Sequence, residues 1–312
     1  MSNILVTGGA GFIGSNIVKE LLTQGHQVRV IDNLITGQKE NLAPVLGRIK
    51  FIQGSILEED KINAAIEGVD DVLHVAALPS VPRSINEPLF SLENNVTITL
   101  KILLKSVEFK VKKLVYSSSS SIYGNTTVLA KVETLPSAPI SPYAVYKNAG
   151  EQLCRVFSKI HGLRTVCLRY FNVFGPNQDP NSPYSAVIPL FIKKMLKGES
   201  PTINGDGSIS RDFTFVDNNV LANILAMQSD KIGQGEVINI ACGQSISLNQ
   251  LVQEINNCLG AKIEPIYGPE RAGDIKQSLA DISLAKKLIG YEPEVSFKDG
   301  LKRTVEHYQN QL

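Results

Sequence analysis

A glycine-rich turn lies between the first apolar run of the chain and the helical stretch that follows it. Residues 4–14 read ILVTGGAGFIG, so Gly8, Gly11 and Gly14 recur at intervals of three. The first glycine allows a tight turn, the second lets a phosphate approach the backbone, and the third lets a helix pack closely on the strand. This order of strand, turn and helix predicts that the chain opens with a unit of a parallel sheet.

The first half of the chain continues to alternate short apolar runs with amphipathic stretches, which is typical of a parallel sheet covered on both faces. We expect strands at Ile4–Thr7, Gln27–Asp32, Ile49–Gln53, Val69–Ala76, Lys113–Ser118 and Arg164–Arg169. We expect helices at Ile13–Gln24, Glu58–Ala65, Leu89–Val107 and Tyr143–His161. The predicted fold class is α/β, a doubly wound parallel sheet (Rossmann) with a smaller interleaved C-terminal substrate domain.

The regular alternation stops after Asn172, where a loop rich in proline and asparagine leads into a predicted helix at Val187–Leu196. Residues 211–216, 220–228 and 237–240 are typical of a strand, a helix and a strand that return to the first sheet. We therefore predict that residues 1–171 with about 212–241 form the first domain, which carries the glycine turn. Residues 172–211 with 242–312 form the second.

Charge and cysteine content restrict the partners of the chain. The formal net charge of +1 over 312 residues gives no reason to expect nucleic acid or an anionic membrane. The four cysteines are widely spaced and the four histidines do not cluster with them, so no metal site is predicted and free thiols in a reducing cytosol fit best. No uncharged apolar stretch of 18 residues occurs and the first basic residue is Lys19, so we expect a cytoplasmic protein.

Asp32 closes the second predicted strand, where a carboxylate can accept hydrogen bonds from both ribose hydroxyls of a dinucleotide. Together with the glycine turn, it predicts a dinucleotide site in the first domain. A carboxylate would repel a ribose phosphate, so the cofactor is NAD rather than NADP. His74–Ala77 ends the fourth predicted strand, and the small side chains of Ala76 and Ala77 could let the cofactor lie against the sheet.

Tyr143 and Lys147 are four residues apart and so share one face of a predicted helix. An unperturbed tyrosine titrates near 10, and a nearby cation in a poorly solvated cleft favours the phenolate, which can act as a base. The serine run 117–121 adds a hydroxyl that can bind the same reacting oxygen. Taken alone, Tyr143 could be an interfacial aromatic and Lys147 an exposed lysine, but the dinucleotide site beside them favours catalysis.

Several segments together resemble the extended short-chain dehydrogenase/reductase family, and the likeness runs nearly end to end. They are Thr7–Gly14, His74–Ala77, Ser117–Tyr123, Tyr143–Lys147 and Arg169–Asn172. Within that family the chain is most similar to nucleotide-sugar 4-epimerases, and especially to bacterial UDP-N-acetylglucosamine 4-epimerases. That closer likeness is carried by Ser80–Ser84, Asn172–Pro189 and Asn204–Phe213.

The resemblance implies a role for each matching residue. Tyr143 would be the base, Lys147 its activator and a ribose ligand, and Ser119 the hydroxyl on the O4 of the sugar. The implied cofactor-binding set is Gly8, Gly11, Phe12, Ile13, Gly14, Asp32, Asn33, Ser55, Ile56, Ala76, Ala77, Asn95, Ser117, Tyr143, Lys147 and Phe171. The implied substrate-binding set is Ser80, Ser119, Ser120, Ser121, Tyr143, Asn172, Gln178, Ala186, Val187, Arg211, Arg271, Asp274 and Ser278.

Three positions refine the roles that the resemblance implies. Ser278 stands where relatives restricted to plain hexoses can carry a tyrosine, and a small side chain leaves room for an acetamido group. Ser55 replaces an aspartate that contacts adenine in many relatives, so that contact is weaker or made by backbone. Pro79 stands where relatives often have lysine or glycine near the cofactor and the sugar.

The resemblance implies an NAD-dependent 4-epimerase of UDP-sugars that works through a transient 4-keto intermediate, with UDP-N-acetylglucosamine and UDP-N-acetylgalactosamine favoured and plain UDP-hexoses also open. Alternatives within the family are a UDP-glucuronate epimerase, a decarboxylase or a 4,6-dehydratase. A remote alternative is a non-catalytic NAD-binding sensor, which would have no need for Tyr143, Lys147 and Ser119 together. A homodimer is also implied, formed by the helices near 89–107 and 143–161.

Overall fold

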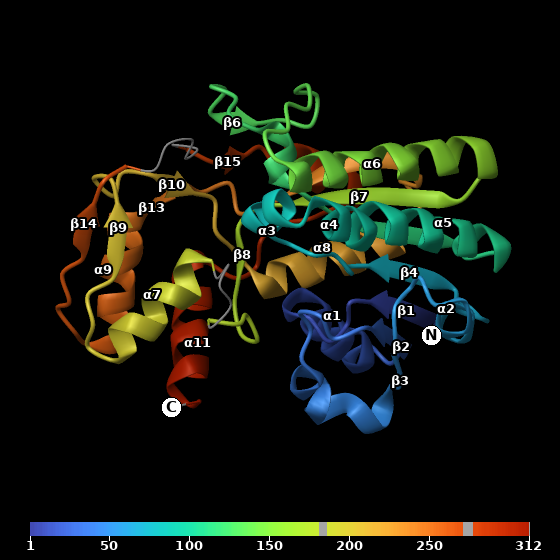
Figure 1. Ribbon diagram of the computed structural model, residues 1–312, viewed down its shortest axis with the longest axis horizontal. Helices are drawn as coiled ribbons and strands as arrows, with labels where there is room; N and C mark the ends of the chain where they lie inside the picture. The colour runs from blue at the N-terminus through green and yellow to red at the C-terminus, as the bar shows by residue number, and fades with distance from the viewer. Residues whose placement is uncertain (181–185, 271–276, 312) are drawn as a thin grey trace.

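The computed structural model describes residues 1–180, 186–270 and 277–311 of the chain. Its centre is a sheet of parallel strands in the order β3-β2-β1-β4-β5-β7-β12 (Figure 1). The strands are β1 Asn3–Thr7, β2 Gln27–Asp32, β3 Lys50–Gln53, β4 Asp71–His74, β5 Lys113–Ser119, β7 Arg164–Tyr170 and β12 Gln234–Ile240. This Rossmann-like arrangement confirms the predicted fold class.

Helices cover both faces of the sheet. The helices α1 Phe12–Thr23 and α8 Val216–Gln228 lie on one face, and α2 Glu59–Ile66, α5 Ile98–Glu108 and α6 Pro142–His161 lie on the other. In β1, Ile4 and Val6 pack in the same core cluster as Ile17 of α1, whereas Leu5 packs with Ile62 of α2. Because successive side chains of a strand point to opposite faces, a strand that is buried on both sides is a continuous apolar run.

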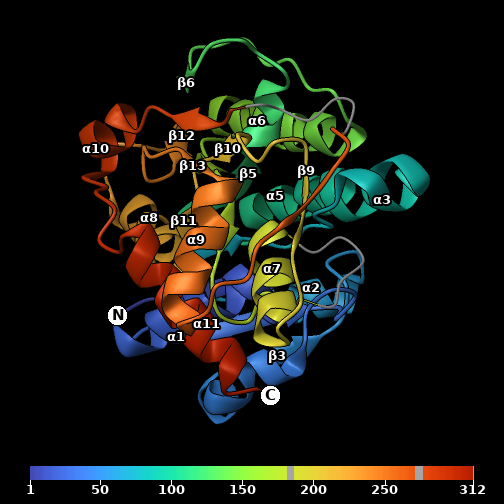
Figure 2. The same cartoon turned by 90° about the vertical axis from the view of Figure 1, so that its left-hand side faces the viewer.

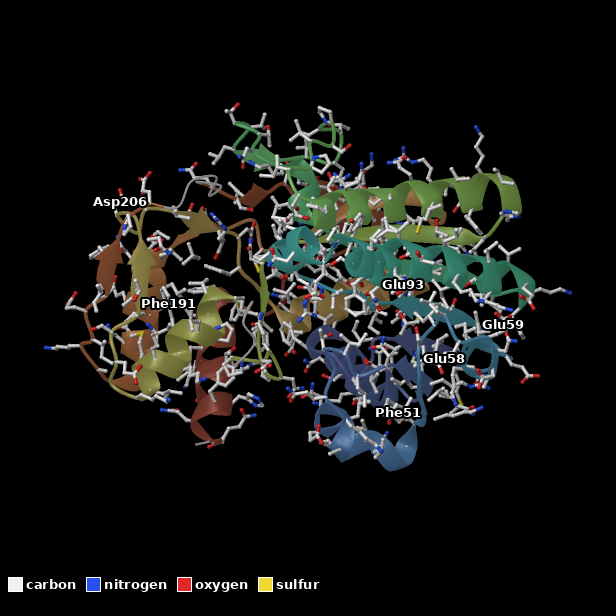
Figure 3. All side chains as sticks on the ribbon, viewed as in Figure 1. Phe51, Glu58, Glu59, Glu93, Phe191 and Asp206 are labelled. Atoms are coloured by element: carbon white, nitrogen blue, oxygen red, sulfur yellow. The ribbon has the colours of Figure 1, made fainter. Side chains whose placement is uncertain are left out.

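A smaller lobe lies beside the sheet and contains α7 Val187–Leu196, α9 Leu248–Leu259, α11 Phe297–Gln309 and the parallel strands β9 Thr202–Asn204 and β14 Ile266–Gly268 (Figures 1 and 2). Figure 3 places Phe191 within this lobe, far from Glu58 and Glu59 at the other end of the molecule. Phe191, Leu251 and Leu301 belong to the same core cluster as the sheet residues. The two parts therefore share one hydrophobic core.

The segment 211–216 does not join the main sheet, so that prediction was wrong. β10 Ser210–Arg211 pairs with β13 Ile246–Ser247, and β11 Thr214–Phe215 pairs with β8 Val173–Phe174. Asp212, which lies between β10 and β11, is buried and accepts hydrogen bonds from the backbone of Cys242, Gly243 and Ala280, which interrupts a continuous strand. Of the two predicted strands, only β12 returns to the sheet. The domain boundaries stay a prediction.

The predicted helix 89–107 is likewise interrupted. It consists of α4 Pro88–Leu92, a π-helical turn Glu93–Thr97 and α5. The remaining elements are α3 Val81–Asn86, α10 Ser283–Ile289, the paired strands β6 Ala130–Lys131 and β15 Leu279–Ala280, and 3₁₀ segments at Lys39–Arg48 and Ser120–Tyr123. Within the described ranges, we find no helix with the length and apolar character that spanning a bilayer requires.

Candidate active site

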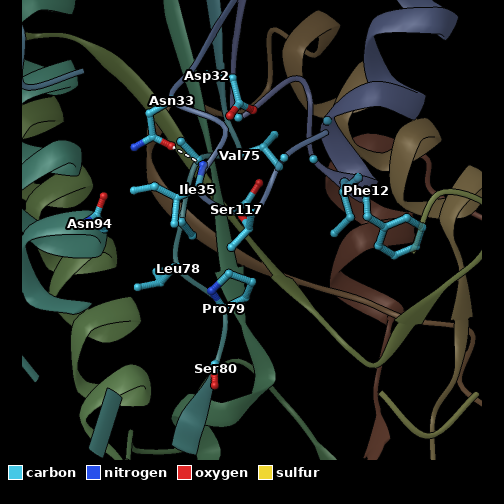
Figure 4. A pocket seen from close by; sticks show the side chains of 18 of the residues that line it. Phe12, Asp32, Asn33, Ile35, Val75, Leu78, Pro79, Ser80, Asn94 and Ser117 are labelled. Atoms are coloured by element: carbon cyan, nitrogen blue, oxygen red, sulfur yellow. Dashed lines mark hydrogen bonds between the residues drawn. The ribbon is translucent and has the colours of Figure 1, made fainter. Parts of the chain in front are cut away.

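A cavity of about 820 Å³ lies at the carboxyl ends of β1, β4 and β5. The strand order reverses between β1 and β4, and open α/β sheets bind their ligands at such a reversal. Figure 4 shows side chains along this cavity, with Asp32 and Ser80 at opposite ends and Ser117 between them. The cavity is therefore elongated, as a site for a dinucleotide requires.

The glycine turn is shaped by two close contacts. Gly8 has a φ of +68°, and a Cβ atom there would lie 2.7 Å from the Cα of Ala76. A Cβ atom on Gly14 would lie 2.2 Å from the carbonyl oxygen of Gly8. The turn thus lies directly against the segment that follows β4, and the start of α1 lies directly against the turn. Gly11 and Phe12 at the N-terminus of α1 line the cavity, and a helix N-terminus is a suitable site for a pyrophosphate.

The Asp32 carboxylate lies at the end of β2 and lines the same cavity. The backbone N–H groups of Ala10 and Leu34 donate to its oxygens at 2.9 and 2.8 Å. Burial raises the pKa of Asp32, and these hydrogen bonds oppose that rise. Next to it, the Asn33 side chain accepts from the Ile35 N–H, the contact dashed in Figure 4. The turn, the carboxylate and the cavity between them fit a dinucleotide.

Tyr143 lies in the first turn of α6, close to the end of β5. Ser141 caps this helix by accepting a hydrogen bond from the Ala144 N–H, and the Tyr143 N–H donates to the Ser84 hydroxyl at 3.1 Å. The Tyr143 phenol is hydrogen-bonded to the side chain of Ser119. Burial raises the pKa of Tyr143 to about 12, and the Ser119 contact opposes that rise. We expected a lowered pKa; in this structure desolvation outweighs the groups that favour the phenolate.

Lys147 lies one turn further along α6 and is 3% exposed. Its ammonium donates to the Ser117 carbonyl oxygen at 2.7 Å and lies 5.0 Å from the centroid of the Tyr116 ring. Burial lowers the pKa of Lys147 to about 8, and the charge of Glu151 opposes that change. The side chains of Tyr143, Lys147 and Ser119 all line the large cavity.

A second pocket of about 240 Å³ adjoins the first and shares Ser119, Tyr170 and Asn172 with it. It brings the serine run together with residues near the smaller lobe, and its lining is Ser119, Ser120, Ser121, Tyr123, Gly124, Lys131, Tyr170, Phe171, Asn172, Arg211 and Ser278. Tyr123, Gly124 and Lys131 did not stand out in the sequence. The hydroxyls of Ser120 and Ser121 come from the 3₁₀ segment that directly follows β5.

Most of the other predicted residues line the large cavity. They are Gly8, Gly11, Phe12, Ile13, Gly14, Asp32, Asn33, Ser55, Ile56, Ala76, Ala77, Ser80, Ser117, Gln178 and Ala186. Asn95 does not line either pocket: it is buried, and its side chain binds the backbone of Leu78 and Ser91. Val187 is absent from both linings and begins α7. Arg271 and Asp274 lie outside the described residues.

Sequence reasoning missed part of the lining of the large cavity. The segment Leu34–Gln38 lines it, and so do Pro79, Arg83, Asn94, Ile98 and Asp179. The position of Leu34–Gln38 directly after Asp32 was a usable signal, because loops that follow parallel strands form such sites. Asn94, which lines the cavity, is the neighbour of the predicted Asn95, and both lie in the π-helical turn.

Three comparisons agree with this geometry. A family described as "NAD dependent epimerase/dehydratase family" matches residues 4–241, which is more than half of the chain. A putative UDP-glucose 4-epimerase from Methanocaldococcus jannaschii is 38% identical over 98% of each chain. A solved UDP-N-acetylglucosamine 4-epimerase from Methanobrevibacter ruminantium M1, in complex with UDP-N-acetylmuramic acid, is 43% identical with a TM-score of 0.95, covering 100% of this chain and 99% of the other.

A solved complex also shows which cofactor a relative binds. The UDP-glucose 4-epimerase from Thermus thermophilus in complex with NAD is 33% identical to this chain, with a TM-score of 0.90 and coverage of 99% of this chain and 100% of the other. The match extends over both the glycine turn and the smaller lobe. The chain therefore belongs to the NAD dependent epimerase/dehydratase family.

Proposed function

We propose that this protein is an NAD-dependent 4-epimerase of UDP-sugars, with UDP-N-acetylglucosamine and UDP-N-acetylgalactosamine as principal substrates and plain UDP-hexoses accepted as well. One observation carries the proposal. Tyr143, Ser119 and Lys147 line the large cavity, and Ser119 also lines the smaller pocket, so a base and a hydroxyl lie where a dinucleotide and a sugar would meet. The relatives described above bear the names of UDP-glucose and UDP-N-acetylglucosamine 4-epimerases.

Tyr143 and Ser119 would act on the C4 hydroxyl of the sugar. The Tyr143 phenolate takes the proton from O4, and Ser119, which is hydrogen-bonded to the phenol, holds the same oxygen in place. When bound, oxidised NAD supplies a hydride acceptor for C4 and a positive charge that favours the phenolate. After the 4-keto sugar has turned over in the pocket, the Tyr143 phenol returns the proton to O4. The hydride that the bound cofactor would return to the opposite face of C4 inverts the configuration, with no net redox change.

The turnover step needs a firm hold on the diphosphate and a loose hold on the sugar. Asn172 and Arg211 lie at the junction of the sheet with the smaller lobe and would bind the diphosphate, since a guanidinium suits phosphate oxygens. Ser119, Ser120 and Ser121 also line the sugar pocket. Small hydroxyl side chains leave the ring free to rotate within the pocket.

A dehydration reaction is less well supported by the pocket. Removal of water from C5 and C6 requires an acid and a base beside the sugar. The described lining of the smaller pocket contains no aspartate or glutamate, and Ser120 and Ser121 occupy the positions that directly follow Ser119. Besides the hydride transfer that bound NAD would support, epimerisation needs one proton transfer at O4, the role that we propose for Tyr143.

The test of the proposal is an NMR assay of the purified protein. It is offered UDP-N-acetylglucosamine and UDP-glucose separately, with no added NAD, and the anomeric proton signals of the C4 epimers are followed. Conversion of either sugar supports the proposal and shows that the cofactor copurifies. If neither sugar is converted even when NAD is supplied, the proposed function is wrong.

Ser278 provides a prediction about substrate choice. Its small side chain lines the pocket of about 240 Å³, and the Ser278→Tyr variant would place a ring there. We expect the kcat/KM for UDP-N-acetylglucosamine to fall about 100-fold while that for UDP-glucose changes only a few fold, because the lost volume excludes the acetamido group. Ser278→Ala, which keeps the space, serves as the control. Equal losses for both sugars would contradict this role of Ser278.

We also propose a homodimer formed by the face that α3 to α6 present. Large apolar side chains are exposed there, including Leu89 at 81%, Leu104 at 49% and Ile160 at 68%. In the two helices from which a dimer was expected, Leu100 and Leu104 are exposed, whereas Phe157 is buried in the core. Light scattering is expected to give twice the chain mass of 34.0 kDa, and Leu100→Glu/Leu104→Glu a monomer. A monomeric parent at micromolar concentration would contradict this.

We also propose where in the cell the enzyme acts and in which kind of synthesis its product is used. Cys154, Cys167, Cys242 and Cys258 all carry free thiols, which supports our proposal of a reducing, cytoplasmic location. Epimerised UDP-sugars are activated donors, and we place the product in polysaccharide biosynthesis.

A further inference from the structure

A buried ion pair lies on α6 one turn beyond Lys147. The Arg169 guanidinium of β7 donates through Nε and Nη2 to the two carboxylate oxygens of Glu151, each at 2.8 Å. The side chain of Glu151 is 1% exposed and that of Arg169 is 6% exposed. The hydroxyl of Ser118 donates a further hydrogen bond to Glu151 at 2.5 Å. The Glu151 carboxylate therefore joins α6, β5 and β7 at one point.

Glu151 lies in line with the catalytic residues. It follows Lys147 by four residues, and Lys147 follows Tyr143 by four, so the three share one face of α6. Its partner Ser118 lies between Ser117, whose carbonyl accepts from Lys147, and Ser119, which contacts Tyr143. The Glu151 carboxylate thus connects α6, which carries Tyr143, to the end of β5, which carries Ser119.

Stability alone does not explain such a pair. Removing two charges from water is costly, and replacing a buried ion pair by apolar side chains of similar volume is often neutral or stabilising. The pair also extends to the sugar pocket, because Arg169 lies 4.6 Å from the centroid of the Tyr123 ring, and Tyr123 lines that pocket. The pair thus contacts both Ser118, the neighbour of Ser119, and Tyr123 of the sugar pocket, which indicates a functional role.

We propose that Glu151, held in place by Arg169, is a positioning residue: its carboxylate keeps the Lys147 ammonium charged and fixes the strand end at Ser118 against α6. The catalytic consequence rests on the proposed function, whereas the effect on Lys147 does not. The Glu151 carboxylate does not reach the sugar pocket or the cofactor cavity, whose described linings omit it. It therefore acts through Lys147 and Ser118.

The groups around Lys147 favour this assignment. Ionisable side chains from α6, β4, β5 and β7 act on the ammonium or lie against it: Glu151, Cys154, His74, Tyr116 and Cys167. Burial raises the pKa of Tyr116 and Cys167 and, with the charge of Lys147, lowers that of His74 to about 3, so these groups are neutral near pH 7. Among the described residues that act on the ammonium, Glu151 supplies the negative charge.

The sign of the effect follows from the pKa of Lys147. Burial lowers that pKa to about 8, and Glu151 raises it against burial. Without the carboxylate charge the pKa falls further, and the ammonium loses its proton closer to neutrality. The alkaline limb of the kcat/KM profile should then move to lower pH.

The experiment compares Glu151→Gln, which removes the charge at constant size, with Glu151→Asp, which keeps it. We expect the alkaline limb of Glu151→Gln to move down by on the order of one pH unit, and that of Glu151→Asp to stay with the parent. A second readout needs no turnover. The titration of Lys147 is followed by NMR of protein labelled with ¹³C at the lysine Cε, with the signal assigned by its loss in Lys147→Arg.

The outcomes distinguish a failure of the proposed epimerase function from a failure of the inference about Glu151. A parent protein that does not epimerise refutes the proposed function, and the NMR titration still tests Glu151. A Glu151→Gln protein whose Lys147 titrates with the parent pKa overturns the inference. If Glu151→Gln does not fold, the same NMR titration is measured on the double variant Glu151→Leu/Arg169→Met, which leaves no unpaired buried charge. A downward shift of the Lys147 titration in that variant supports the inference, and a parent-like titration overturns it.

Discussion

Replacing Tyr143 by phenylalanine is expected to reduce epimerisation by about 10²- to 10⁴-fold while bound NAD is retained. The phenol is hydrogen-bonded to Ser119 within the cavity, and phenylalanine keeps the ring but removes the group that accepts the O4 proton. Activity is measured by the NMR assay with UDP-N-acetylglucosamine. The NAD content is measured separately in the supernatant of the denatured protein.

Tyr146 offers a matched control on the same helix. Its hydroxyl donates to the Pro88 carbonyl oxygen at the surface, away from the cavity lining, so Tyr146→Phe also removes one phenol from α6. We expect that variant to keep the activity of the parent. A Tyr143→Phe protein that binds NAD and epimerises at the parent rate would refute the assignment of the base.

The Gly14→Ala substitution is expected to have the second large effect. The added Cβ atom would lie 2.2 Å from the Gly8 carbonyl oxygen and 2.8 Å from the Gly9 Cα, and both of these are backbone atoms. The start of α1 must therefore move away from the turn, at a cost of about 1–3 kcal/mol. Because the same turn faces the cofactor cavity, we expect NAD affinity to fall about ten- to 100-fold.

Gly47→Ala is the control for this prediction, because a Cβ atom there meets nothing within 4 Å. Thermal unfolding and NAD titration by calorimetry are measured for both variants. A Gly14→Ala protein with the unfolding temperature and the NAD affinity of the parent would show that the turn tolerates the added methyl group. Loss of NAD affinity in both variants would show that the effect does not come from the turn.

Much of the sheet could be predicted because its strands are buried on both faces. In β1 the apolar run Ile4–Val6 and in β5 the shorter run Leu114–Tyr116 reflect this burial and stand out in the sequence. The glycine turn, Asp32 and the spacing of Tyr143 and Lys147 are local features, so their joint placement at one cavity follows from the order of the strands.

Features that depend on tertiary contacts could not be predicted in the same way. Asp212 interrupts a strand because three backbone N–H groups from distant segments donate to it. In the π-helical turn Glu93–Thr97 both Asn94 and Asn95 are buried, but Asn94 lines the cavity, whereas Asn95 binds the backbone of Leu78 and Ser91. Glu151 and Arg169 are 18 residues apart, and only the packing of α6 on β7 makes them partners.

The aromatic cluster at the junction of the two parts has a consequence for how a nucleotide enters. Four pairs among Phe174, Phe213, Phe215 and Phe297 are stacked, tilted or T-shaped, with ring centroids 5.6 to 6.3 Å apart. Hinge motion between domains is the usual expectation unless their interface is large and apolar. Here a large hinge opening would expose these packed rings to water, which is costly. We therefore expect nucleotides to enter and leave through local rearrangement of loops around the cavity rather than through hinge motion of the two parts.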